Sequence, residues 1–207
     1  MSTVVVVAGG EAIDPSHLHD LPRSAFVIAA DSGLDRAQEV GLVPDLVVGD
    51  LDSAGSEALS DHHGAVERHP TDKDATDLEL ALRAAGRRRP DHIVVLGGGG
   101  GRFDHLLGNV LVLTTVEGAT VEWRPVGATI HIVRERCELE MRVGSVVSLI
   151  PVQGSVHVLS TSGLRWPLHD ETLDFGTTRG VSNESTRSSV TVEVANGLLA
   201  LVVPRQP

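Results

Sequence analysis

Carboxylate side chains stand where a predicted strand ends. Asp50 and Asp52 flank one leucine in the stretch Val-Val-Gly-Asp-Leu-Asp-Ser, residues 47–53. In an extended chain, residues i and i+2 face the same side, roughly 6.5–7 Å apart. The two carboxylates can then bind one Mg²⁺, which proteins hold with one or two carboxylates plus substrate phosphates. A polar turn, with Ser53 capping the next helix, explains the same residues, and the motif alone leaves both interpretations open.

A run of glycines forms the second candidate site. Residues 97–101 are all glycine and come directly after a predicted buried strand. Such loops expose backbone N–H groups to phosphate, and the adjacent Arg102 adds a bidentate donor. Asp104 can reach a metal or a hydroxyl, and His105 and Asn109 share a helix face because they are four residues apart. Glycine-rich loops are weak signals alone, but the position after a strand favours an anion site.

Residues 71–82 form a third cluster, in which Thr76 and Glu79 have the spacing of a capping box at a helix N-terminus. Asp77 suits the first turn of a helix electrostatically, and it can also bind a metal. Capping does not explain Lys73 or the density of aspartates beside it. This stretch alone indicates a helix start and leaves a catalytic role open.

Trp166 is one of two tryptophans and lies between Arg165 and Pro167. Indole is the best side chain for holding a cation or a flat ring. A tryptophan that packs against a sheet explains the sequence equally well.

The elements that must position these residues differ between the two halves. Residues 1–124 alternate strand and helix patterns, which predicts a doubly wound, mostly parallel α/β sheet. The expected strands are Val4–Ala8, Phe26–Ala30, Asp45–Val48, Ala65–Arg68, Ile93–Leu96 and Thr120–Trp123. The expected helices are Leu34–Val40, Ser56–His62, Asp77–Ala85 and Leu106–Val116. Ligands of such sheets bind beyond the carboxyl ends of the strands, and unusual residues follow three of these strands, at 31–33, 49–53 and 97–105.

Residues 125–207 carry short alternating segments separated by Gly, Ser, Asn and Pro, which predicts an all-β sandwich or barrel. We therefore expect an α/β domain over 1–124 and a β domain over 125–207. The expected strands of the second domain are Thr129–Arg134, Ser145–Ile150, Val156–Leu159, Val190–Val194 and Leu198–Val203.

Composition excludes several classes of function. The formal charge of −11 argues against nucleic acid as the main partner. No apolar run approaches the roughly 18 residues of a membrane span, so we expect no membrane partner. Cys137 is the single cysteine and cannot form an intramolecular disulfide, and the first residues do not have the pattern of a signal peptide. The expected location is the cytoplasm.

Six short motifs occur in order along nearly the whole chain: DSG at 31–33, GDLDS at 49–53, KDATD at 73–77, GGRFDH at 100–105 with Asn109, GLRWPL at 163–168, and GVSNE at 180–184. Together they resemble the thiamine pyrophosphokinase family. The resemblance implies an α/β nucleotide domain followed by a β-sandwich that binds thiamine. It implies pyrophosphoryl transfer from ATP to thiamine, dependent on Mg²⁺, by a homodimer with thiamine bound between the subunits.

The resemblance also implies roles for single residues. It implies a catalytic acidic centre of Asp31, Asp50, Asp52 and Asp77, of which Asp50, Asp52 and Asp77 hold the metal. The residues implied to bind ATP are Lys73, Thr76, Arg102, Asp104, His105 and Asn109. Trp166 would stack on the thiamine pyrimidine, and Ser182 and Asn183 would bond that ring.

Three other functions remain open from the residues. A pyrophosphokinase for another alcohol, such as a pterin, would keep the nucleotide half and change the β half. A nucleotide-sugar transferase would use Asp50 and Asp52 as its metal motif but leaves KDATD and GGRFDH unexplained. A non-catalytic nucleotide- or thiamine-binding protein would have no need of the four acidic residues.

Overall fold

The chain forms two compact units in this computed structural model, residues 1–126 and 127–207. The structure describes residues 1–52 and 54–205. The division comes after Val126, whereas the sequence placed it after Arg124. Ser53, expected to cap a helix, lies outside the described residues, and Gly55 occupies the N-cap position of that helix.

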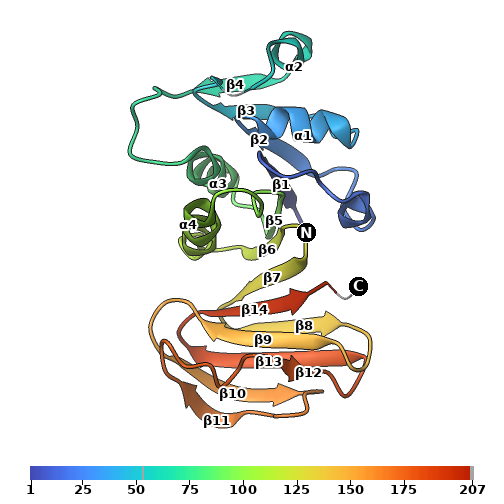
Figure 1. Ribbon diagram of the computed structural model, residues 1–207, viewed down its shortest axis with the longest axis vertical. Coiled ribbons are helices and arrows are strands. Elements are labelled where there is room, and N and C mark those ends of the chain that lie inside the picture. Colours follow the sequence, from blue (N-terminus) through green and yellow to red (C-terminus); the bar gives the residue numbers. More distant parts are fainter. Residues whose placement is uncertain (53, 206–207) are drawn as a thin grey trace. The chain divides into compact units, whose positions relative to one another are not determined.

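The first unit is built on a parallel sheet with the strand order β6-β5-β1-β2-β3-β4 (Figure 1). Every pairing between neighbours in this order is parallel. The strands are β1 (Thr3–Ala8), β2 (Phe26–Ala30), β3 (Leu46–Gly49), β4 (Ala65–Arg68), β5 (His92–Leu96) and β6 (Thr120–Arg124). The α/β, mostly parallel fold expected from the strand–helix alternation is confirmed.

Helices cover this sheet on two sides, with α1 on one side and α3 and α4 on the other (Figure 1). Contacts join α3 to β1, β2 and β3, and α1 to β1 and β2. The elements between the strands are η1 (Pro15–Leu18), α1 (Gly33–Glu39), α2 (Ser56–Asp61), α3 (Asp77–Arg87) and α4 (Phe103–Leu113). Among the described residues, no helix is long and apolar enough to cross a membrane.

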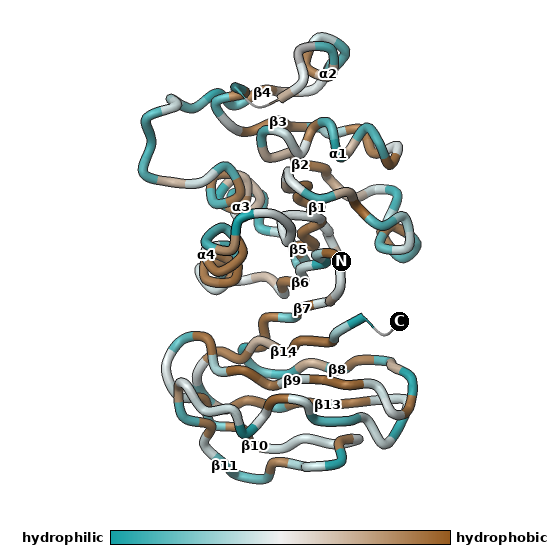
Figure 2. Tube along the Cα trace, viewed as in Figure 1, coloured by the Kyte–Doolittle hydropathy of each residue, from teal (hydrophilic) through white to brown (hydrophobic). Residues whose placement is uncertain are grey.

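The central strands are apolar on both faces because helices cover both (Figure 2). The four valines of β1, residues 4–7, are at most 3% exposed. Ile28 of β2 and Ile93 of β5 are fully buried as well. This packed core fixes the positions of the strand ends, so the loops that follow them start from a rigid edge of the sheet.

The strand order reverses between β1 and β5. The strand that follows β1 in sequence, β2, lies on one side of this pair, and the strand that follows β5, β6, lies on the other side. A doubly wound sheet opens a crevice beyond the carboxyl ends of the strands at such a reversal. Gly9 and Gly10 follow β1 at this point, and the glycine run at 97–101 follows β5. The sheet topology therefore places a ligand site between these two loops.

The second unit consists of two antiparallel sheets with the strand orders β12-β9-β14-β7 and β11-β10-β13-β8. Valine and leucine side chains from both sheets form one core, including Val147, Leu149, Val158 and Val192. The strands are β7 (Ala128–Val133), β8 (Arg136–Glu140), β9 (Val146–Pro151), β10 (Val156–Ser162), β11 (His169–Leu173), β12 (Asn183–Glu184), β13 (Ser189–Asn196) and β14 (Leu199–Pro204). The all-β sandwich is confirmed.

Some elements differ from the sequence prediction. β8, β11 and β12 were not expected, because β8 and β11 are mostly polar strands at sheet edges and β12 has only two residues. Helix α4 begins at Phe103 and ends at Leu113, whereas Leu106–Val116 was expected. The cap at Thr76 is confirmed, since its Oγ1 accepts a hydrogen bond from the Glu79 N–H at 3.2 Å.

Arg124 holds the end of β6 to the segment after η1. Its guanidinium donates to both carboxylate oxygens of Asp20, at 2.7 and 2.8 Å, and to the Glu122 carboxylate at 2.6 Å. It also donates to the His17 carbonyl. The arginine side chain is 8% exposed and Glu122 is 14% exposed, so the pair is largely shielded from water.

We predict that Arg124→Met destabilises the protein by about 3 kcal/mol, because it removes the guanidinium that pairs with the largely buried Glu122 carboxylate. Urea unfolding measures this change. Arg136→Met is the matched control: Arg136 also pairs with two glutamates, but its side chain is 55% exposed. Exposed pairs contribute about 0–1 kcal/mol, so equal losses in the two variants would contradict the prediction.

Candidate active site

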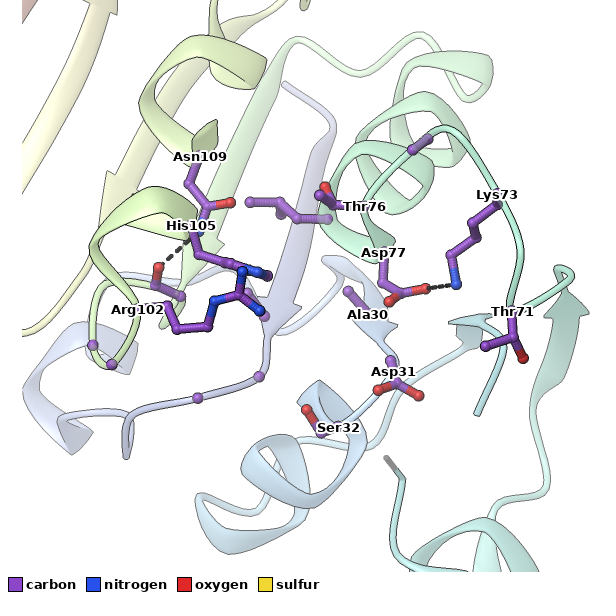
Figure 3. Close-up of a pocket in the computed structure, with 18 residues that line it drawn as sticks. Ala30, Asp31, Ser32, Thr71, Lys73, Thr76, Asp77, Arg102, His105 and Asn109 are labelled. Atoms are coloured by element: carbon purple, nitrogen blue, oxygen red, sulfur yellow. Dashed lines mark hydrogen bonds and ion pairs between the residues drawn. The ribbon is translucent and has the colours of Figure 1, made fainter. Parts of the chain in front are cut away.

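A pocket of about 520 Å³ lies at the switch point of the first unit (Figure 3). Its volume falls within the roughly 300–1,000 Å³ typical of small-molecule sites. It is lined by Gly9 and Gly10 after β1, by the end of β2, by the start of α3, and by the loop after β5. Seven predicted site residues line it: Asp31, Lys73, Thr76, Asp77, Arg102, His105 and Asn109.

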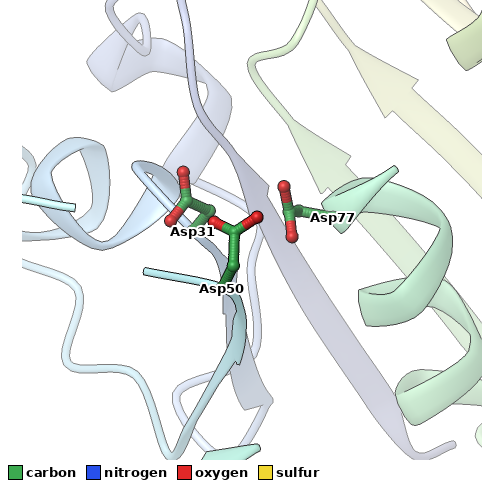
Figure 4. Close-up of side chains that lie close together, drawn as sticks. All are labelled: Asp31, Asp50 and Asp77. Carbon is green, nitrogen blue, oxygen red and sulfur yellow. The ribbon is translucent and has the colours of Figure 1, made fainter. Parts of the chain in front are cut away.

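Three carboxylates lie close together (Figure 4), of which Asp31 and Asp77 line the pocket and Asp50 does not. Asp31 follows β2, Asp50 follows β3 and Asp77 begins α3, and one oxygen from each lies within 4.8 Å of the others. The N–H of Asp31 donates to the Val48 carbonyl at 2.9 Å, which joins the ends of β2 and β3. Residues far apart in sequence therefore meet because adjacent parallel strands end at the same edge.

The backbone around the cluster is strained to allow this approach. Asp31 has a φ of +47° and Gly49 a φ of +151°. A Cβ at position 49 would lie 2.9 Å from Asp77 Oδ1 and 3.0 Å from Asp31 Cβ. Only glycine fits at position 49, and aspartate is among the residues that tolerate a positive φ at position 31.

Lys73 is the cation that faces the cluster. Its Nζ donates to Asp50 Oδ2 at 2.5 Å and lies 3.0 Å from Asp77 Oδ1. Burial lowers the pKa of Lys73, but bonding to Asp50 and Asp77 outweighs this and raises the pKa overall. The hydrogen bond from Lys73 is also the main cause that holds the pKa of Asp50 below its usual value.

Asp31 experiences the opposite effect. Burial raises the pKa of the Asp31 carboxyl, and the charges of Asp77, Asp50 and Asp52 raise it further. One ammonium thus faces three carboxylates, and the cluster carries excess negative charge.

The donor set fits a hard divalent cation. The buried oxygen Asp31 Oδ1 has no hydrogen-bond partner among the described residues, and the buried Asp77 Oδ1 has only its ion pair with Lys73, at 3.0 Å. Buried carboxylate oxygens are normally paired or bound to a metal. All three ligands are carboxylates, the ligand type that Mg²⁺ prefers.

Asp52 lies outside this group of three. Of the two interpretations of residues 50–52, the structure has the turn and not the extended chain, because Leu51 has a φ of +64°. Leu51 is buried and packs in a core cluster with Leu34 and Val47. The Asp52 side chain is exposed, and its N–H donates to Asp50 Oδ1 at 3.3 Å. The charge of Asp52 still affects the cluster, because it contributes to the raised pKa of Asp31.

The opposite side of the pocket is formed by the glycine run and the start of α4. Arg102 forms two hydrogen bonds with the Asp104 carboxylate, at 3.1 and 2.6 Å. These bonds lower the pKa of Asp104 to about 2 and raise that of Arg102. Asp104 does not line the pocket; it orients the guanidinium that does. The Asn109 amide donates to the Gly98 carbonyl at 2.7 Å, so it also orients the loop.

The predicted residues of the second unit form a separate group. Trp166 is 51% exposed, and the Arg165 guanidinium lies 5.0 Å from its ring centre. The Asn183 side chain is buried and pairs with the backbone of Trp166, accepting from its N–H at 3.1 Å and donating to its carbonyl at 2.8 Å. Asn183 therefore holds Trp166 in place. Ser182 is exposed, with a φ of +58°.

Sequence reasoning missed part of the pocket lining. Gly9, Gly10, Ser32 and Thr71 line it, and none was singled out as a site residue. The glycine pair directly after β1 was a usable signal, because it stands at a strand end like the other clusters. A Cβ on Gly9 would lie 2.1 Å from Ser32 Oγ, so these two loops approach closely.

Two family models match the chain. Residues 19–123 match "Thiamin pyrophosphokinase, catalytic domain", and residues 129–199 match "Thiamin pyrophosphokinase, vitamin B1 binding domain". A thiamine pyrophosphokinase of Bacillus subtilis is 29% identical over 210 residues, covering 98% of each chain. A rice protein named thiamine pyrophosphokinase 1 is 27% identical over 75% of this chain and 64% of its own length.

Solved structures agree with this fold. The crystal structure of Bacillus subtilis thiamine pyrophosphokinase covers 100% of both chains with a TM-score of 0.86 and 25% identity. The Candida albicans structure has a TM-score of 0.80 at 14% identity, covering 99% of this chain and 89% of its own, and supports the fold alone.

We predict that Asp31→Asn weakens Mn²⁺ binding about tenfold or more, because it removes one of three converging carboxylates. Isothermal titration without nucleotide measures the affinity. Asp52→Asn is the matched control, since Asp52 lies outside the group of three; an equal loss in that variant would show that the group is wrongly assigned.

The same substitution is predicted to stabilise the metal-free protein. The pKa of Asp31 is raised in the folded state, so its ionised form opposes folding above that pKa, and this penalty disappears as the pH falls through it. Urea unfolding of the metal-free proteins should show Asp31→Asn more stable at pH 7, with the gap closing in acid. A less stable variant at pH 7 would contradict this account.

Proposed function

The chain belongs to the thiamine pyrophosphokinase family, and from this we propose that it transfers the pyrophosphoryl group of ATP to the hydroxyl of thiamine, giving thiamine diphosphate and AMP. The observation that carries the proposal is the meeting, in one pocket, of a carboxylate cluster with a glycine-rich loop and Arg102. The first group suits a metal and the second suits phosphates.

In the reaction, the thiamine hydroxyl oxygen bonds to the β-phosphorus of ATP. The bond from that phosphorus to the oxygen bridging the α- and β-phosphates breaks, AMP leaves with this oxygen, and the hydroxyl proton is released. Such transfers require positioning and charge neutralisation more than covalent catalysis by the protein.

The side chains divide this work. Arg102 and the backbone of the glycine loop hold phosphate oxygens, with Asp104 keeping the guanidinium in place. Thr76 and Lys73 line the same pocket at the start of α3, and His105 and Asn109 line it from α4. These six residues are the proposed ATP contacts or their supports.

We propose Mg²⁺ as the metal, held by Asp50, Asp77 and Asp31, with Asp52 adding charge from the rim. When bound, Mg²⁺ neutralises the phosphates and orients them for in-line transfer. The bound metal and Lys73 would together offset the negative charge of the three carboxylates.

Thiamine is proposed to stack on Trp166, whose indole face suits its flat, cationic rings. Ser182, exposed and adjacent to Asn183 in the sequence, offers a hydroxyl, and Asn183 keeps Trp166 in its conformation. We further propose a cytoplasmic homodimer with thiamine between the subunits. The dimer and the shared site are what the resemblance to the family implies, and the location is the one expected from the sequence.

The reaction itself is tested with purified protein, ATP, Mg²⁺ and thiamine. We expect thiamine diphosphate and AMP in equal amounts, resolved by chromatography. ADP with thiamine monophosphate would overturn pyrophosphoryl transfer, and turnover of a pterin alcohol but not of thiamine would assign another substrate. Nucleotide binding without any product would favour a non-catalytic protein.

Trp166→Ala is predicted to raise the KM for thiamine about tenfold, equivalent to about 1.4 kcal/mol of stacking, with the KM for ATP unchanged. Steady-state kinetics with each substrate varied in turn measures both values. A loss of thermal stability with unchanged kinetics would instead assign Trp166 to packing.

Mixing variants tests the shared site. Asp50→Asn and Trp166→Ala damage different parts of it, so a heterodimer of the two has one intact site if thiamine lies between subunits. Activity should rise above either variant alone after co-refolding. No rise in a mixture verified as heterodimeric would place both residues in one subunit's site.

A further inference from the structure

The glycine loop after β5 is held by a carboxylate that belongs to neither the metal cluster nor any predicted set. Glu11 follows the glycine pair after β1. Its Oε1 accepts the N–H of Gly99 at 3.0 Å and the N–H of Val126 at 2.7 Å. One side chain thereby joins three segments of the first unit: the loop after β1, the loop after β5 and the chain after β6.

Close packing around Glu11 supports a defined position. A Cβ on Gly99 would lie 2.7 Å from Glu11 Oε1 and 2.3 Å from Pro125 Cβ. A Cβ on Gly100 would lie 2.9 Å from both the Cβ and Oε2 of Glu11. The glycines of the loop are therefore needed where Glu11 approaches, and the contact extends over consecutive residues.

The carbonyls of the same loop are held from the other side. Trp123, fully buried on β6, donates its Nε1–H to the Gly97 carbonyl at 2.6 Å. Asn109 donates to the Gly98 carbonyl at 2.7 Å. With Glu11 accepting from the Gly99 N–H, three successive residues have side-chain partners on their backbone, and these partners hold the loop in one conformation.

The loop needs these side-chain partners because regular secondary structure does not hold its backbone. Gly97, Gly98 and Gly101 have φ values of +74°, +74° and +85°, and none of the loop belongs to a helix or strand. Glycine loses more conformational freedom on ordering than any other residue. A phosphate-binding loop that is ordered only when nucleotide arrives would bind it less tightly, because binding must then supply the ordering.

We infer that Glu11 is a positioning residue for nucleotide binding, acting through the Gly99 N–H and not through contact with substrate. Glu11 does not line the pocket, whereas Gly98, Gly100 and Gly101 do. A carboxylate that lined the pocket would repel phosphates. Glu11 instead lies outside the pocket lining, where its Oε1 accepts two N–H groups. This inference rests on the proposed use of the pocket for ATP.

The test is the affinity for α,β-methylene ATP with Mg²⁺, an analogue that cannot transfer its pyrophosphoryl group. We expect Glu11→Ala to raise its Kd about tenfold, since the N–H groups of Gly99 and Val126 lose their acceptor. Glu11→Gln, which keeps an acceptor oxygen, should stay within about threefold of the wild type. Glu117→Ala is the control, because Glu117 is exposed and makes no ion pair or side-chain hydrogen bond among the described residues.

Kinetics separates positioning from a general structural role. The KM for ATP should rise in Glu11→Ala while the KM for thiamine stays at the wild-type value. An unchanged Kd in Glu11→Ala, or an equal loss in Glu11→Gln, overturns the inference. So does a lower melting temperature with unchanged nucleotide affinity.

Two further outcomes are distinguishable. If Glu11→Ala does not fold, Glu11→Asp decides, because its shorter side chain keeps the charge but withdraws the acceptor; tight binding by that variant contradicts the inference. If the wild type binds the analogue but makes no thiamine diphosphate, the proposed reaction fails while the Glu11 comparison stands. If the wild type does not bind the analogue, both fail.

Discussion

Electrostatic repulsion among Asp31, Asp50 and Asp77 is the constraint on which the site depends. Three carboxylates lie within 4.8 Å of one another and face one lysine, and the charges of the other two help to raise the pKa of Asp31. The sheet supplies the rigidity that holds them there. The positive φ values of Asp31 and Gly49 belong to the same arrangement, and a Cβ at position 49 would lie 2.9 Å from Asp77 Oδ1.

The two sides of the pocket offer different interactions to a ligand. At the ends of β2 and β3, charge is concentrated and desolvated, as the raised pKa of Asp31 records. At the ends of β1 and β5, the backbone itself is the binding element, and neutral or paired groups such as Trp123, Asn109 and Glu11 fix its shape. An ATP–Mg²⁺ complex suits both sides, since its metal requires carboxylates and its phosphates require N–H and guanidinium donors.

Most of the fold was predictable because the apolar patterns of strands and the cap residues of helices are local signals in the sequence. The boundaries of β2 and β4 and the Thr76 cap match the prediction. Polar edge strands such as β8 were not predictable, since half of their side chains face water and the apolar signal is weak. The position of Asp52 outside the group of three was not predictable for a similar reason: the positive φ of Leu51 accompanies the packing of that leucine in a core cluster built by other elements.

The sequence by itself determined the chemistry: which residues carry charge, where phosphate can approach a glycine-rich backbone, and, through six ordered motifs, the family. Only the tertiary structure decided which of those groups meet. Asp31 and Asp77 join Asp50 while Asp52 does not, and Asn183 supports Trp166 through its backbone. A lone glutamate such as Glu11 carries no sequence signal at all. Its role follows from the parallel order of β1, β5 and β6, which brings residues 88 and 115 positions away in sequence within hydrogen-bond distance of one side chain.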